Sequence, residues 1–322
     1  MSAPRIAAAL LLGSLVGVSC VCAQNFPSKP VRIVVPSSPG GGADTTARLL
    51  AQRLSDVFGQ QVIVDNRPGA GNIIGTELVA KAAPDGYTLL LAINNHAINA
   101  SLYRKLPYDP IQDFAPISLL ITAPHILVVH PSLPVKSIQD LIRLARAKPG
   151  EINYASAGNG TSAHFAAELF KLNAKVQMTH IPYKSLSGAV TDVVSGAVQV
   201  MFPSPLTALG QMKAGRLKGL AVTTARRSQT MPELPTIQES GVAGYEFSTW
   251  YGLLAPRATP DAQITRLNQA VVQILRSKDM QARVTGDGGD PVGSSPDAYG
   301  AFLKVEVEKY AKLVKQIGLQ ID

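Results

Sequence analysis

Short runs of β-branched and apolar residues alternate with stretches of helical periodicity along most of the chain. The first unit places an expected strand at residues 31–35 before an expected helix at residues 44–58. Further strands are expected at residues 61–65, 87–93, 152–155, 176–181, 198–202, 217–223 and 247–255. Further helices are expected at residues 72–83, 138–147, 162–172, 188–195, 206–214, 260–277 and 296–317. This alternation predicts parallel strands joined by helices.

A long apolar stretch at residues 117–129 is interrupted by Thr-Ala-Pro at residues 122–124. We interpret it as one strand that leaves a first lobe and another that enters a second lobe, after which the alternation restarts. The expected strand at residues 247–255 then carries the chain back. The pattern predicts an α/β fold of two lobes with a two-crossing hinge and a central cleft as the ligand site. The expected boundaries are residues 24–123 plus 250–322 for lobe 1 and residues 124–249 for lobe 2.

The first 23 residues have the layout of a cleavable signal peptide. Arg5 precedes an apolar run at residues 7–18, and Val21-Cys22-Ala23 stands before an expected cleavage site that leaves Gln24 first. A buried helix or a retained anchor are the alternatives, although the run is shorter than the roughly 20 residues that a membrane span needs. Both cysteines of the chain lie in this segment. The mature protein is therefore expected in the periplasm without disulfides, thiol catalysis or cysteine-based metal sites.

Composition and charge narrow the function classes. The chain has 322 residues, 46% of them hydrophobic and 16% charged, which suits a large buried core rather than disorder. Its formal charge of +8 comes from scattered Lys and Arg. Nucleic-acid binding would need a concentrated basic patch with aromatic partners, so we expect none. Motifs for hydrolase nucleophiles, zinc proteases and nucleotide binding are missing, so no catalytic residue, metal or cofactor is expected.

Two glycine-rich segments each stand between an expected strand and an expected helix: PSSPGGGADT at residues 36–45 and YASAGNGTS at residues 154–162. Glycine lets backbone N–H groups approach a ligand, and a helix N-terminus adds partial positive charge. Each segment alone is also compatible with an ordinary tight turn, but one per lobe favours a carboxylate or phosphate site. Asp44 is interpreted as a helix N-cap. His164, one turn into the second helix, is the histidine expected nearest the ligand.

Several segments, in this order, resemble the tripartite tricarboxylate transporter substrate-binding proteins, the Bug (Bordetella uptake gene) family. They are residues 26–32 (FPSKPVR), 39–44 (PGGGAD), 64–72 (VDNRPGAGN), 84–88 (PDGYT), 153–161 (NYASAGNGT) and 181–184 (IPYK). The resemblance implies a periplasmic binding protein fold of type II. It also implies a small carboxylate held by backbone amides and ordered waters. The partners expected are this ligand and a membrane complex of one large and one small integral subunit, with the binding protein itself a monomer.

The resemblance also implies the site residues. The ligand contacts expected by motif position are Ser37, Ser38, Gly40, Gly41, Ala43, Asn72, Asn95, Ser156, Gly158, Gly160, Thr161 and His164, and Ser204 is a neutral candidate beside them. Many relatives have Asp where this chain has Pro203, and an amine would need such an acid, so we expect a ligand without an obligatory amine. Two rival functions remain open at this stage: a ligand sensor for a signalling receptor, and an exported enzyme acting on a carboxylated substrate.

Overall fold

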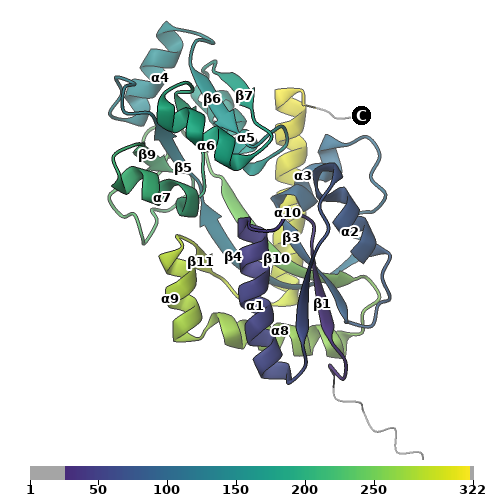
Figure 1. Cartoon of the computed structure of the whole chain (residues 1–322). Helices are drawn as coiled ribbons and strands as arrows, with labels where there is room; N and C mark the ends of the chain where they lie inside the picture. Colours follow the sequence, from purple (N-terminus) through teal and green to yellow (C-terminus); the bar gives the residue numbers. More distant parts are fainter. Residues whose placement is uncertain (1–25, 320–322) are drawn as a thin grey trace, which may run out of the picture.

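The structure, a computed structural model, describes residues 26–319 and shows two lobes, each built on its own β-sheet (Figure 1). The expected signal peptide lies outside the described residues. The first lobe contains a six-stranded sheet in the order β11-β4-β10-β3-β1-β2. Its strands are β1 Val31–Val35, β2 Val62–Asn66, β3 Thr88–Ile93, β4 Phe114–Pro124, β10 Ser248–Pro256 and β11 Asp290–Pro291.

Strand β1 pairs in parallel with β2 and β3, whereas β10 runs antiparallel to β3 and β4. Alternate residues of the strands enter two different cores, as the period of two requires. Ile33 and Leu91 pack under helices α1, α8 and α9, whereas Val34 and Leu90 pack under α2, α3 and α10. The bounds of these helices are α1 Gly42–Phe58, α2 Ile73–Ala80, α3 Asn94–Leu102, α8 Asp261–Leu275, α9 Lys278–Gly286 and α10 Pro296–Ile317.

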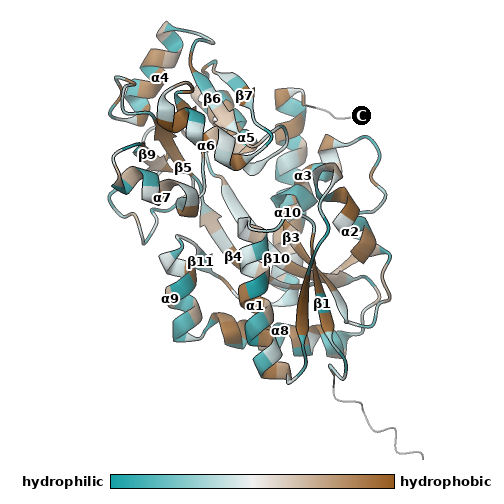
Figure 2. Cartoon of the chain, in the orientation of Figure 1, coloured by the Kyte–Doolittle hydropathy of each residue, from teal (hydrophilic) through white to brown (hydrophobic). Residues whose placement is uncertain are grey.

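The second lobe contains a five-stranded sheet in the order β7-β6-β8-β5-β9. Its strands are β5 Ile126–Val129, β6 Asn153–Ser156, β7 Thr179–Pro182, β8 Val200–Met201 and β9 Lys218–Val222. Helices α4 and α5 cover one face, and α6 and α7 cover the other. Their bounds are α4 Ile138–Ala147, α5 Ser162–Ala174, α6 Leu186–Ser195 and α7 Pro205–Lys213. Figure 2 shows apolar strands inside both lobes and mixed polar and apolar surfaces on the helices, the pattern expected of amphipathic layers.

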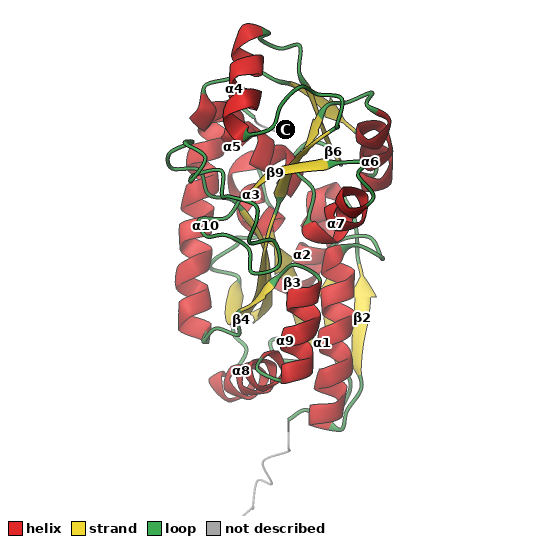
Figure 3. Cartoon of the chain, turned by 90° about the vertical axis from the view of Figure 1, so that its left-hand side faces the viewer, coloured by secondary structure: helices red, strands yellow, loops and turns green. Residues whose placement is uncertain are grey.

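The chain crosses between the lobes twice. The first crossing is at His125, between β4 and β5, and the second lies where Phe247 leads into β10. Helix α10 runs beside both lobes (Figure 3). Its Tyr310 packs against Phe165 of the second lobe, with ring centroids 5.8 Å apart, so one apolar core continues from lobe to lobe.

The predicted order of elements is confirmed from β1 to α10, with most ends shifted by a few residues. Three elements were not predicted: α3, α9 and the two-residue strand β11. The predicted helix at residues 72–83 is shorter in the structure: residues 70–72 form a 3-10 turn before α2 begins, and Lys81, with φ −96° and ψ 1°, leaves the helical conformation after Ala80. The break in the long apolar stretch lies at His125 rather than at residues 122–124.

Candidate functional site

Parallel strand pairing brings the two glycine-rich loops to facing edges of the sheets. Strands β1, β2 and β3 end at one edge of the first sheet, and β6, β7 and β8 end at one edge of the second. The carboxyl ends of parallel strands, and the helix N-termini that follow them, are the usual ligand-binding edge of such sheets. The first loop follows β1 and leads into α1, and the second follows β6 and leads into α5.

The N-terminus of α1 has no side-chain cap. Its N-cap is Gly41, and no side chain accepts a hydrogen bond from the first turn. The amides of Gly42, Ala43 and Asp44 therefore have no intrahelical acceptor. Helices α4, α5, α6 and α10 each begin with a Ser or Thr whose hydroxyl accepts from the first turn, whereas α2, α3, α7, α8 and α9 start without a side-chain cap, as α1 does. The open amide groups of α1, with the partial positive charge of the helix end, are suited to an anion.

The prediction that Asp44 caps α1 is wrong in position. Asp44 is the third residue of the helix, and its Oδ2 accepts from the amide of Gly40 at 2.9 Å. Arg48 Nε donates to both carboxylate oxygens at 3.0 Å. Burial alone would raise the pKa of Asp44, but the hydrogen bonds from Arg48 and Gly40 outweigh it and lower that pKa. The carboxylate thus fixes the loop and has its charge balanced, which reduces its repulsion of an anion at the helix end.

Other predicted residues of the first lobe lie around this helix end. The Ser37 carbonyl accepts from Asn66 Nδ2 at 3.1 Å, while the Ser37 hydroxyl is buried without a hydrogen-bond partner among the described residues. An unpaired buried hydroxyl is costly, so a ligand or water is its expected partner. Ser38, Gly40 and Gly41 are exposed. Asn72 has a left-handed backbone conformation at the start of α2, with φ 79°, and its side chain does not cap that helix.

In the second loop, several predicted donors are already engaged within the loop. The amide of Gly160 donates to His164 Nδ1 at 3.1 Å, and the amide of Gly158 donates to Ser156 Oγ at 3.1 Å. Thr161 Oγ1 donates to the Gly158 carbonyl at 2.8 Å and accepts from the His164 amide. The expectation that Gly160 and Gly158 offer free amides is therefore not met in this conformation. Of the amides that begin α5, that of His164 donates to Thr161, which leaves those of Ser162 and Ala163 without an intrahelical acceptor.

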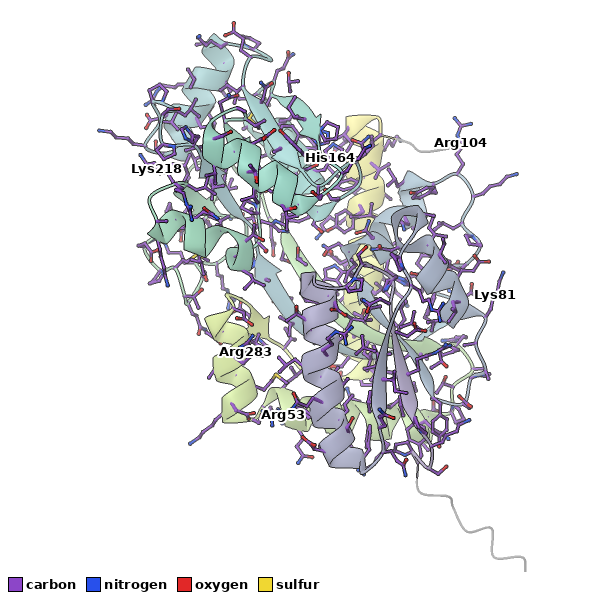
Figure 4. The ribbon with its side chains drawn as sticks, viewed as in Figure 1. Arg53, Lys81, Arg104, His164, Lys218 and Arg283 are labelled. Carbon is purple, nitrogen blue, oxygen red and sulfur yellow. The ribbon has the colours of Figure 1, made fainter. Side chains whose placement is uncertain are left out.

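His164 belongs to a stack of aromatic rings behind the second loop. Its ring lies 4.1 Å from that of His180, which in turn lies 4.8 Å from Tyr154. His180 Nε2 lies 2.7 Å from Ser156 Oγ, so both histidines contact the loop. Burial and then the neighbouring His180 lower the pKa of His164 to about 4, and burial lowers the pKa of His180 as well. Figure 4 places His164 inside the upper lobe. With lowered pKa values, His164 and His180 are neutral at pH 7, and they support the loop by ring packing and hydrogen bonds.

Besides the packing of Tyr310 on Phe165, side chains near the two loops and near α7 join the lobes. Asn95, the second residue of α3, donates from Nδ2 to the carbonyl of Gly160 at 3.2 Å, so two predicted site residues meet across the lobes. A Cβ atom on Gly160 would lie 3.1 Å from Leu102 of the same helix. On the other side, Pro205 of α7 packs against Gly288, at a φ of +81° that favours glycine. These contacts join α3 to the second loop and α7 to the segment that follows α9.

A cavity of about 80 Å³ lies between the lobes beside the start of α1. It is lined by the first turns of α1, by β4 and β10, by the start of α7 and by the end of α9. Gly42 and Ser204 line it, and so does Tyr251, whose hydroxyl would lie 2.5 Å from a Cβ atom on Gly42. Tyr251 was not predicted as a site residue, because no local motif marks a tyrosine in a long strand. Pro203 is buried, and its carbonyl accepts from the Ile126 amide.

Two absences hold within residues 26–319. No cluster of three or more His, Cys, Asp or Glu side chains is arranged to bind a metal ion. No helix in that part of the chain combines the length and apolarity needed to cross a bilayer.

Comparison with known proteins identifies similar chains. Residues 46–319 match the family model described as the tripartite tricarboxylate transporter family receptor. The protein BugT of Bordetella pertussis is 36% identical over 94% of this chain and 93% of its own. The Rhodopseudomonas palustris protein Rpa4515, solved with adipate, is 37% identical with a TM-score of 0.84, covering 92% of this chain and 99% of its own. MatC from the same organism, solved with bound malate, is 30% identical with a TM-score of 0.79, covering 90% and 100%.

Proposed function

Because this chain belongs to the tripartite tricarboxylate transporter receptor family, and within it to the Bug proteins, we propose that it captures a small carboxylate between its lobes and delivers it to the membrane subunits of such a transporter. It acts as a monomer in the periplasm and does not transform its ligand. The predicted signal peptide supports export, and the intact mass of the exported protein tests it: a chain beginning before Gln24 would contradict cleavage there.

The observation that carries the proposal is the uncapped N-terminus of α1. Gly41 leaves three helix amides without an acceptor at the edge where the second lobe closes. The buried Ser37 hydroxyl adds a polar group without a partner, and Asp44 is neutralised by Arg48. This is an anion site without a formal positive charge, suited to a carboxylate. The adipate and malate held by two similar proteins support the same ligand class.

Binding without chemistry also fits the titratable groups. His164 accepts from the Gly160 amide, and His180 contacts Ser156, so each histidine is engaged in holding the loop. Glu168, the carboxylate nearest to them, is held by Tyr154 and Lys171. A general acid–base mechanism needs a group that is free to reach the substrate. These groups instead stabilise the loop, which supports a binding role.

The substitution Gly41→Asp tests the site. The backbone at Gly41 has φ −83° and ψ 173°, and a Cβ atom there would have ordinary contacts, so aspartate is accommodated. An aspartate N-cap would accept from the helix amides and stabilise the fold by a few tenths of a kcal/mol. It would also occupy the amides and repel an anion, so binding of succinate, malate or adipate measured by calorimetry should weaken by about tenfold or more.

The control is Gln177→Glu, which adds the same charge at an exposed position before β7, at the opposite edge of the second sheet. It should leave binding unchanged. If the Gly41→Asp variant binds these acids as tightly as the parent protein, the end of α1 is not the carboxylate site. A folded parent protein that binds none of the acids would overturn the proposed function itself.

A further inference from the structure

Helix α3, which packs on α10 (Figure 1), is anchored in the first lobe by two buried asparagines. Asn94 Nδ2 donates to the carbonyl of Ser248 at 2.8 Å, and Asn94 Oδ1 accepts from the amide of Trp250 at 3.1 Å. These bonds join the start of the helix to β10 directly after the second crossing of the chain. Asn99 Nδ2 donates to the carbonyl of Gly71 at 2.8 Å. The helix is therefore held both to the hinge strand and to the turn at residues 70–72.

Asn95 connects this anchored helix to the second lobe. It lies four residues before Asn99, on the same face of the helix. Its Nδ2 donates to the carbonyl of the buried Gly160 at 3.2 Å. The amide of Gly160 donates to His164 Nδ1, so the second loop is held at this residue from two sides. One of the two hydrogen bonds comes from within the second lobe, and the other comes from the first lobe.

We propose that Asn95 is a latch between the lobes, a positioning residue that acts through Gly160 and not through a contact with the ligand. Without Asn95 the buried Gly160 carbonyl would lose this donor. Water could take the place of the donor if the lobes moved apart, and an unpaired buried carbonyl is costly. The latch therefore stabilises the arrangements in which α3 meets the second loop.

A latch has a consequence for affinity that a ligand contact does not have. The proposal rests on the carboxylate capture proposed above for this consequence alone. Every acid that bridges the lobes meets the same equilibrium between joined and separated lobes. When the joined fraction falls, the apparent dissociation constant of each acid rises by the same factor. Loss of a direct contact would instead affect acids of different size and shape to different degrees.

The substitution Asn95→Ala removes the donor and places a residue of higher helix propensity in α3, so the fold should be retained. X-ray scattering of the ligand-free variant should give a larger radius of gyration than that of the parent protein, because separated lobes become more populated. Calorimetry with succinate, malate and adipate should show all three bound more weakly by one common factor of up to about fivefold, the value of one hydrogen bond.

The matched control is Asn173→Ala in α5. Asn173 Nδ2 donates to the carbonyl of Ala243 at 3.4 Å, and both residues lie between the two crossings of the chain, so this bond does not join the lobes. The control variant should keep the radius of gyration and the affinities of the parent protein.

Two results would overturn the latch. One is an unchanged radius of gyration in ligand-free Asn95→Ala. The other is a loss of affinity that differs among the three acids by more than about twofold, which would indicate a ligand contact. A parent protein that binds none of the acids would remove the proposed function, whereas the scattering comparison would still decide the latch.

Discussion

His125 Nε2 lies 2.6 Å from Thr249 Oγ1, and this contact joins the two crossings of the chain. The other ring nitrogen, Nδ1, lies 2.5 Å from the carbonyl of Phe202, which can only accept. His125 therefore donates from Nδ1 to that carbonyl and accepts at Nε2 from the threonine hydroxyl. These two hydrogen bonds hold the first crossing, at His125, in place against the second crossing, at Thr249.

Removal of that hydroxyl tests the hinge. Thr249→Val leaves Nε2 of the buried His125 without a donor, which should lower the free energy of unfolding by about 1–3 kcal/mol in urea titrations. Thr249→Ser keeps a hydroxyl and should recover most of the loss. Equal stability of the valine variant and the parent protein would show that this contact does not stabilise the hinge.

Stability should fall as pH drops from about 6.5 to about 4. Burial lowers the pKa of His96, His125 and His164 to about 4 each, so the folded protein keeps them neutral while the unfolded chain takes up protons below pH 6.5. Each histidine contributes at most about 3 kcal/mol to this loss. Unfolding free energies at pH 7, 5.5 and 4.5 measure it. The slope should lessen in His96→Gln, and an unchanged slope in that variant would exclude His96 as a source.

The contact of Tyr251 with Gly42 predicts that the effect of Gly42→Ala on the free energy of unfolding changes sign when Tyr251 is replaced by phenylalanine. In the parent protein Gly42→Ala would place Cβ 2.5 Å from the tyrosine hydroxyl, so the substitution should destabilise. In a Tyr251→Phe background that oxygen is gone, and alanine should instead stabilise the helix by up to about 1 kcal/mol. Urea unfolding midpoints of the parent protein, the two single variants and the double variant give the coupling free energy between Gly42 and Tyr251. The same effect of alanine in both backgrounds would mean that the tyrosine is not held over the helix end.

Free amino acids should not be ligands. Pro203 has no charge, and its carbonyl is engaged by Ile126. The acid that lines the cavity, Asp287, is already paired with Arg283 at 3.1 Å. Figure 4 shows Arg283 on the α9 side of the lower lobe. Glutarate should raise the melting temperature and glutamate should not, because only a ligand of the folded state stabilises it. Stabilisation by glutamate alone would show that an ammonium partner exists.

Ligand should compact the protein. The contacts of Asn95 with Gly160 and of Pro205 with Gly288 join the lobes, and a ligand that bridges the lobes should favour the conformations in which such contacts form. The radius of gyration from X-ray scattering should be smaller with saturating succinate or adipate than without. An identical value, with binding confirmed by calorimetry, would mean that the lobes are closed before the ligand arrives.

Elements with complete local signals could be predicted from the sequence. The bounds predicted for residues 138–147 match α4, because Ser137 caps that helix and the apolar residues Ile138, Leu141, Ile142 and Ala145 recur at helical spacing. Residues 296–317 match α10 for the same kind of reason: Ser295 caps it, and Gly318 ends it in a left-handed conformation. Here local and tertiary preferences agree.

The features that the sequence did not predict are those whose conformation depends on contacts with residues far away in the chain. Helix α3 buries Asn94, His96 and Asn99, so its polar residues obscure the apolar face that periodicity detects. Asn94 is held by Ser248 and Tyr310, more than 150 residues away. Tyr251 likewise reaches the site only because β10 returns beside β3. The engaged amide of Gly160 depends on the orientation of one histidine ring, which spacing along the chain does not specify.

The backbone character of the proposed anion site has an evolutionary consequence. A carboxylate held by main-chain amides is insensitive to most side-chain exchange around it, provided that the glycine turn keeps its shape. The walls of the neighbouring cavity, in contrast, consist of side chains, each of which a single codon change can enlarge or shrink. Substitutions in the walls are therefore expected to change which acid is preferred, while the acid-binding end of α1 is retained.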